Sequence, residues 1–351
     1  MDAEQGPTSK PPVISDQAAQ GAGDLADLGH SQALSRKFDT WGMLSLAFVF
    51  LGTWSVFAQS LASGLNNGGP ITILWGLCLV TFCNTCIGVF LGEICSSMPI
   101  AMGQAYWVSQ LWPIPAGRFT SYLCAWINTF GWWTLSASTV VFVTEFILGM
   151  NLLFDETATA PQAFWVQFLV YLGTTVLSTL LNVVSCRRDK TLAYGLTAFD
   201  AAIHLVEEIP APRKNVPRVI WLSTICGAAT GFLFMVVCLF SIQDLEQVLD
   251  PTTGPPFMDL VRSTVGLQGA AVLIALFIIN GLGQGVTVVT TASRLTWGFA
   301  RDGGIPWSSY FSHVDEKWKA PVSALWLQEF IIGLVGLLYT FSKTVLEAIV
   351  G

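Results

Sequence analysis

A lone acidic residue, Asp200, lies in a short apolar segment interrupted by glycine, within the stretch AYGLTAFDAAIHLVEEIPAPRKNVP (193–217). In a membrane protein, an ionisable side chain in a broken apolar segment indicates a functional site, as in the substrate sites of transporters. A buried carboxyl group could hold a substrate ammonium or carry a coupling proton, because burial favours its neutral form. Asp200 could equally cap a helix that restarts after the break. The two roles are compatible and both stay open. His204, one helical turn on, is expected to pack or to relay protons rather than to act as a ligand.

A second candidate lies in the first apolar stretch, WGMLSLAFVFLGTWSVFAQSLASGLNNGGP (41–70), at Leu51, Gly52, Thr53 and Trp54. Glycine in a membrane helix usually marks close helix packing, and on this stretch alone that interpretation is favoured. Together with the interrupted segment around Asp200, a helix break is favoured instead. Its free N–H groups would face an anionic substrate group, and Trp54 could contact a cation through its ring.

The elements that must position these residues are membrane-spanning helices. The chain is 53% hydrophobic and 11% charged, with a mean hydropathy of +0.60, whereas soluble domains carry about 25% charged residues. Its apolar residues fall in runs long enough to cross a bilayer. We therefore predict an all-α integral membrane protein: a disordered cytoplasmic tail over 1–38 and a polytopic domain over 39–351. The predicted spans are 41–63, 70–94, 119–149, 163–185, 219–241, 267–292 and 321–342.

The distribution of basic residues predicts the orientation of these spans. If the tail is cytoplasmic, fourteen of the sixteen Lys and Arg residues face the cytoplasm, and only Arg262 and Lys343 face outward. The segment 191–206 has basic flanks that both belong inside, and as a helix it would reach about 24 Å of the ~30 Å hydrocarbon core. It either re-enters and returns or is the remnant of a longer span. These alternatives stay open.

Two further stretches are predicted to be structural. Glu207 and Glu208, followed by Ile-Pro-Ala-Pro-Arg-Lys, are typical of a cytoplasmic helix end that makes gating contacts. The residues 293–306 are predicted to form a basic turn just after a span. Cys83 and Cys86 have CxxC spacing (CNTC), but they lie within an apolar span with no second pair and no nearby histidine, and the chain has only three histidines. We therefore expect no metal and no cofactor. No catalytic constellation is present, and neither an enzyme nor a nucleic-acid partner is expected.

Three stretches resemble the fungal amino acid/choline transporter family of the amino acid–polyamine–organocation superfamily. They are LGEICSSMPIAMGQAYWVSQL (91–111), LTAFDAAIHLVEEIPAPRKNVPRVI (196–220) and SRLTWGFARDGGIP (293–306). The resemblance implies a LeuT-like bundle of twelve spans, with two inverted repeats and broken first and sixth helices. Family members move choline, GABA, other amino acids or polyamines, generally with protons. The implied substrate site combines Leu51–Trp54 with a second group: Gly195, Leu196, Thr197, Ala198, Phe199 and Asp200, of which Asp200 would couple protons.

The chain departs from this family pattern in two places. The sequence RRDK (187–190) stands where the fifth span and the start of the sixth are expected, and the chain stops after the ninth span by family count. We predict proton-coupled uptake of choline, GABA or an amino acid by alternating access, in the plasma membrane with a cytoplasmic N-terminus. The alternative is a truncated product that does not transport, or a regulatory partner of a full-length permease. Loss of the fifth span would expose unpaired backbone groups to lipid.

Overall fold

The structure is a computed structural model that describes residues 53–155, 157–159, 163–187, 211–249, 254–318 and 320–338. It also describes residues 161 and 207 and a few residues between 21 and 29. Within these residues the fold is all-α, and its only β-type pairing is an isolated bridge between Asp315 and Ala320. The helices are α3 (Thr53–Asn66), α4 (Gly69–Ser97), α5 (Gln104–Leu111), α6 (Pro115–Phe154), α7 (Phe164–Arg187), α9 (Pro212–Ser241), α10 (Leu245–Leu249), α11 (Pro256–Arg301), α12 (Ser308–Phe311) and α13 (Val322–Gly336).

Five of these helices are long and apolar enough to cross a membrane: α4, α6, α7, α9 and α11. Each coincides with a predicted span, and α13 is a shorter apolar helix inside the predicted span 321–342. Only the second half of the predicted span 41–63 is described, as the start of α3. The prediction of an all-α, multi-pass membrane protein is therefore confirmed.

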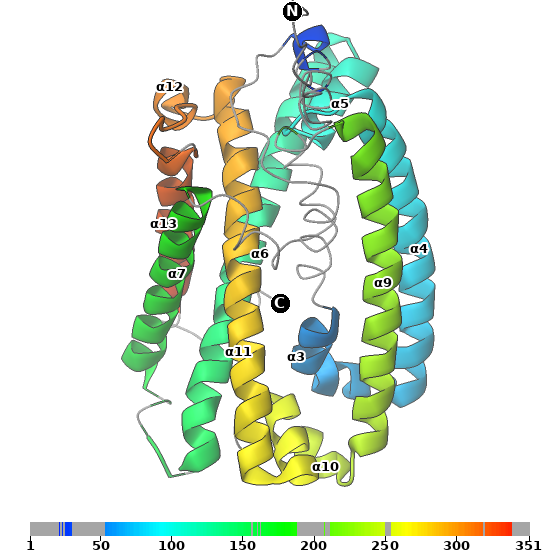
Figure 1. Cartoon of the computed structure of the whole chain (residues 1–351), viewed down its shortest axis with the longest axis vertical. Coiled ribbons are helices and arrows are strands. Elements are labelled where there is room, and N and C mark those ends of the chain that lie inside the picture. Colours follow the sequence, from blue (N-terminus) through cyan, green and yellow to red (C-terminus); the bar gives the residue numbers. More distant parts are fainter. Residues whose placement is uncertain are drawn as a thin grey trace, which may run out of the picture.

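The long helices form two packed groups (Figure 1). In one group α4 lies along α9, with α3 beside them; in the other α11 lies along α6, and both also contact α7 and α13. Glycines allow the close approaches. A Cβ on Gly281 would lie 2.7 Å from Val143 of α6, and one on Gly92 of α4 would lie 3.2 Å from the Pro217 Cα of α9. Packing of this kind, rather than burial of apolar surface, holds helices together in lipid.

Helix α11 bends at Gly266, whose φ of 74° and ψ of 175° interrupt an otherwise continuous helix. That backbone conformation strains any residue with a Cβ, so glycine fits the position. The predicted span 267–292 begins directly after this bend. Beyond the bend the helix continues to Arg301, well past the predicted end of the span.

Helix extends into two stretches where the sequence did not predict it. Soon after the predicted helix end at Glu207 and Glu208, Pro212 starts α9, and Pro217 lies within that helix. Proline is tolerated in a first helical turn because its missing N–H would have no partner there, and at Pro217 one backbone bond is lost. The predicted basic turn 293–306 is likewise helical up to Arg301, and Arg294 is buried in it.

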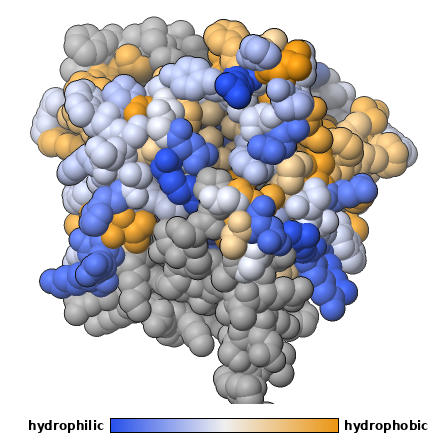
Figure 2. Space-filling view, turned by 90° about the horizontal axis from the view of Figure 1, so that it is seen from above, coloured by the Kyte–Doolittle hydropathy of each residue, from blue (hydrophilic) through white to orange (hydrophobic). Residues whose placement is uncertain are grey.

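The helices alternate in direction, so the described parts of the three resembling stretches collect at one end of the bundle (Figure 1). We call this the motif end; α5, α12, the start of α9 and the end of α11 lie there. Seen from above, the described residues of the motif end include many hydrophilic ones, interspersed with hydrophobic patches (Figure 2). Within the predicted tail, Leu25 is fully buried and Leu28 packs against the cluster that contains Trp107 and Phe299.

Candidate gating site

Most of the predicted substrate-site residues lie outside the described part of the chain. This holds for Leu51 and Gly52 and for the whole group from Gly195 through Leu196, Thr197, Ala198 and Phe199 to Asp200. Thr53 and Trp54 are described only as the first residues of α3. The predicted breaks and the role of Asp200 therefore stay predictions.

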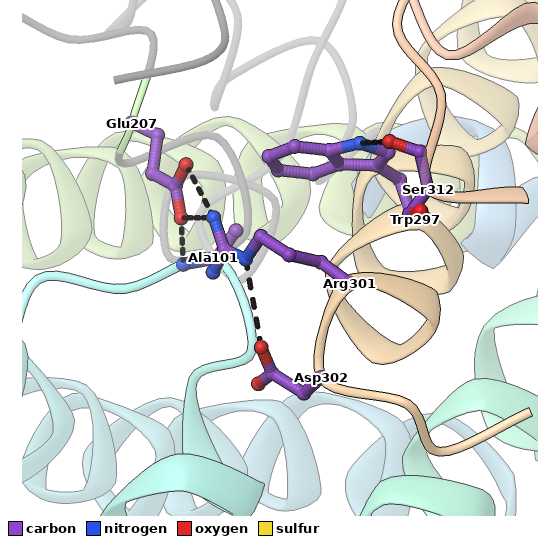
Figure 3. Close-up of polar contacts among 6 residues, drawn as sticks. All are labelled: Ala101, Glu207, Trp297, Arg301, Asp302 and Ser312. Carbon is purple, nitrogen blue, oxygen red and sulfur yellow. Dashed lines mark hydrogen bonds and ion pairs between the residues drawn. The ribbon is translucent and has the colours of Figure 1, made fainter. Parts of the chain in front are cut away.

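The described residues instead bring the three resembling stretches together at one ion pair. Glu207 comes from the second stretch, Arg301 from the third and Ala101 from the first (Figure 3). The Arg301 Nη1 donates to both carboxylate oxygens of Glu207 at 3.1 Å, and the Ala101 backbone N–H donates to Oε1 at 3.2 Å. Three elements far apart in the sequence are thereby tied to one carboxylate.

Local structure explains why Ala101 presents its N–H. Helix α4 ends at Ser97, and the chain turns at Gly103, whose φ of 52° suits a residue without a Cβ, before α5 begins. The Trp107 side chain closes this turn by donating from Nε1 to the Met98 carbonyl at 2.9 Å. The turn is buried, so its N–H has a dry environment in which a charge-assisted hydrogen bond is strong.

Arg301 is the last residue of α11, and its guanidinium is held on several sides (Figure 3). Its Cζ lies 4.8 Å from the centre of the Trp297 ring, and its Nε lies 3.5 Å from an oxygen of Asp302. Trp297 is itself fixed by donating from Nε1 to the Ser312 carbonyl at 2.9 Å. The guanidinium is thus positioned by α11 and by the chain leading from α12.

The pair is nearly dry: the Glu207 side chain is 0% exposed and that of Arg301 is 17% exposed. Removing one partner of such a pair strands a buried charge, which is far more costly than the net value of the pair. The Arg301 Nε and Nη2 have no hydrogen-bond partner in the described residues. They could therefore bind water or another hydrogen-bond acceptor. The arrangement suits a contact that forms in one conformation and opens in another.

Tyr106 on α5 lies beside this site. Burial, with a smaller contribution from the negative charge of Asp302, raises the pKa of its phenol. Both effects disfavour a phenolate next to the Glu207–Arg301 pair. No group of acidic residues, histidines or cysteines that could hold a metal is found in the described part of the chain.

A separate groove of about 370 Å³ lies between α3, α4 and α9. Its lining is mostly apolar, with Ser60, Asn67 and Thr72 among the polar residues, and it lies well away from the ion pair. Nothing in its chemistry selects an anion or an ammonium group, so it does not replace the predicted substrate site.

Sequence reasoning predicted gating contacts for Glu207 but missed both partners. Arg301 could have been found from the sequence because it lies in one of the three resembling stretches. It was missed because that stretch was predicted to be an ordinary basic turn. Ala101 contributes only a backbone N–H, which no side-chain pattern can reveal.

Residues 190–351 match the family model described as amino acid permease. A choline transporter of Saccharomyces cerevisiae is 27% identical over 373 aligned positions, which cover 90% of this chain and 66% of that protein. A GABA-specific permease of the same yeast is 23% identical, and its alignment covers 90% of this chain and 66% of that permease. The amino-acid permease BAT1 of Arabidopsis thaliana is also 23% identical, and its alignment covers 88% of this chain and 73% of that protein. The chain spans just under two thirds of the length of the two yeast relatives.

Proposed function

Because this chain is a relative of the amino acid permeases, we propose that it carries a small amine-containing solute across a membrane rather than catalysing a reaction. The observation that carries the proposal is the meeting of the three resembling stretches at the Glu207–Arg301 pair. Such a pair between helix ends can close one side of an alternating-access pathway. Choline, GABA and amino acids are the candidate solutes, since these are named for its relatives.

The motif end faces the cytoplasm in this proposal. Fourteen of the sixteen Lys and Arg residues would then lie inside, in agreement with the positive-inside rule. The Glu207–Arg301 pair would be an inner gate, and the site formed by Leu51–Trp54 and Gly195–Asp200 would lie above it. Asp200 would bind the coupling proton or the substrate ammonium, and the protein would reside in the plasma membrane.

Uptake of labelled choline and GABA by a permease-deficient fungal strain tests this proposal. We expect the full chain to raise uptake of one solute, Glu207→Gln to reduce it, and Asp200→Asn to abolish its pH dependence. Glu246→Gln, on an exposed part of α10, is the matched control and should not change uptake. If Asp200→Asn left uptake and its pH dependence intact, the role assigned to Asp200 would be wrong.

A second candidate, a product that does not transport alone, is favoured by the lengths of the alignments. The choline transporter alignment runs over 373 positions but takes in 90% of 351 residues, about 316, so roughly 57 positions have no counterpart here. A helix that spans the membrane needs about 20 residues, so this number of positions is enough for the predicted fifth span and the start of the sixth. The family match begins at Lys190, within the predicted RRDK junction.

Sequencing of the mature transcript across codons 180–191 separates the two candidates. An additional coding segment at the junction would favour a full permease, of which this chain is an abridged form. A short junction, together with no uptake by the expressed chain, would favour the non-transporting product. Co-purification with a full-length permease would then test whether it is a regulatory partner.

A further inference from the structure

A carboxyl group lies inside the apolar helix α13, whose sequence is VSALWLQEFIIGLVG. Glu329 is the only charged residue of that helix, and it is 7% exposed. It lies seven residues from the start of α13, which places it about 10 Å along the helix from the motif end. The gate described above does not use this residue.

The contacts of Glu329 are unequal for its two oxygens. The Thr179 hydroxyl on α7 donates to Oε2 at 2.5 Å, whereas Oε1 is buried and has no hydrogen-bond partner among the described residues. No Lys or Arg in the described residues forms an ion pair with it, although Arg294 is buried on the neighbouring α11. Within the described part of the chain, the carboxyl group is therefore enclosed without an ion-pair partner.

Among the described residues, the other polar groups on the neighbouring helices make contacts of their own rather than an ion pair with this carboxyl group. On α7, Tyr171 donates its hydroxyl to the Ile332 carbonyl, and on α6, Ser136 receives a hydrogen bond from Gln328. Arg294 on α11 donates to Ser293. Glu145 of α6 lies nine residues from Ser136, about 13 Å along that helix. On α12, Tyr310 is exposed at the motif end.

An ionised carboxylate with one unpaired oxygen is strongly disfavoured in a membrane interior. A neutral carboxyl group fits the observed contacts better, since Oε2, as the carbonyl oxygen, can accept the hydrogen bond from the Thr179 hydroxyl while Oε1 carries the proton.

A bound metal cation would need several oxygens converging on it, and Thr179 supplies the only hydroxyl bonded to this carboxyl group in the described residues.

We propose that Glu329 is a proton-binding site within the membrane domain, at the contact between α7 and α13. The bound proton keeps this contact closed, because its loss would place a bare charge between two tightly packed helices. The packing there is close: a Cβ on Gly336 of α13 would lie 2.3 Å from the Tyr171 ring of α7. The proposal does not depend on which solute is carried, nor on whether the chain transports alone.

Infrared difference spectroscopy of the purified full chain in lipid nanodiscs tests the proposal. We expect a carbonyl band of a protonated carboxyl group at neutral pH that disappears in Glu329→Gln and persists in the exposed control Glu246→Gln. Thr179→Val retains the carboxyl group but removes its hydrogen bond, so the band should move to higher frequency. This second variant keeps the test decisive if Glu329→Gln fails to fold.

Three outcomes would overturn the proposal. One is a neutral-pH spectrum that is the same in Glu329→Gln as in the unmodified chain, which would mean that Glu329 is ionised. Another is a band unmoved by Thr179→Val. The third is loss of the band on addition of sodium chloride but not of potassium chloride, which would identify a sodium site. Loss of solute uptake with an intact band would count against the proposed transport but not against this site.

Discussion

At the scale of single residues, Glu207 carries the contact that unites the three resembling stretches. Glu207→Gln leaves the Arg301 guanidinium facing a neutral amide in a nearly dry site, so we expect a loss of about 3 kcal/mol in stability. Asp302→Asn changes a more exposed neighbour that forms no aligned hydrogen bond with Arg301, and it should cost less than about 1 kcal/mol. Thermal unfolding of the purified variants measures both. Equal losses would mean that Glu207 is not the principal partner of Arg301.

A pH effect belongs to the same site. Burial and the charge of Asp302 raise the pKa of Tyr106 above its ordinary value of 10.0, so the folded chain holds that proton more tightly than the unfolded chain. The free energy that this tighter proton binding adds to folding is present in full below the ordinary pKa of tyrosine. It is lost as the pH rises through the raised pKa of Tyr106 in the folded chain. Asp302→Asn should lower the Tyr106 pKa. Phenolate absorbance, with Tyr106→Phe subtracted, measures it, and an unchanged midpoint would contradict the assignment.

At the scale of elements, the contact between α4 and α9 depends on a glycine. A Cβ on Gly92 would lie 3.2 Å from the Pro217 Cα and 3.3 Å from its Cβ, and the backbone cannot yield as a flexible side chain can. Gly92→Leu should therefore cost about 1–3 kcal/mol by overpacking. Gly76→Leu on the same helix has no atom within 4 Å of its new Cβ and serves as the control. Thermal unfolding in detergent compares the two, and equal losses would exclude a role for the close approach.

The helices show what the sequence could and could not predict. Apolar runs locate the part of a helix that lies in hydrocarbon, and the span 267–292 was confirmed within α11 for this reason. They do not locate the polar turns by which a helix continues beyond the hydrocarbon. For this reason the prediction missed that α9 begins at Pro212 rather than at residue 219 and that α11 continues to Arg301. Contacts made by a backbone N–H, such as that of Ala101, or between distant charges depend on the folded chain path. No local pattern reports them.

At the scale of the whole molecule, the motif end carries the Glu207–Arg301 contact and exposed hydrophilic residues (Figure 2), whereas the flanks of the long helices carry many exposed apolar side chains. Exposed hydrophobic side chains such as Phe82 and Phe90 on α4 or Phe240 on α9 suit a lipid surface, where they need no protein partner. Glu207 and Glu329 lie in different helix contacts, one at the motif end and one deeper within the bundle. The proposed gate and the proposed proton site can therefore be altered separately by substitution.

The proposed orientation predicts which residues are reachable from outside the cell. Thr159, after α6, and Glu316, after α12, are both exposed and lie toward opposite ends of the bundle. With the motif end in the cytoplasm, a membrane-impermeant maleimide should label Thr159→Cys on intact cells and Glu316→Cys only after permeabilisation. Labelling of the unmodified chain, which has eight cysteines, sets the background. The reverse pattern would place the Glu207–Arg301 contact on the outer side and make it an outer gate.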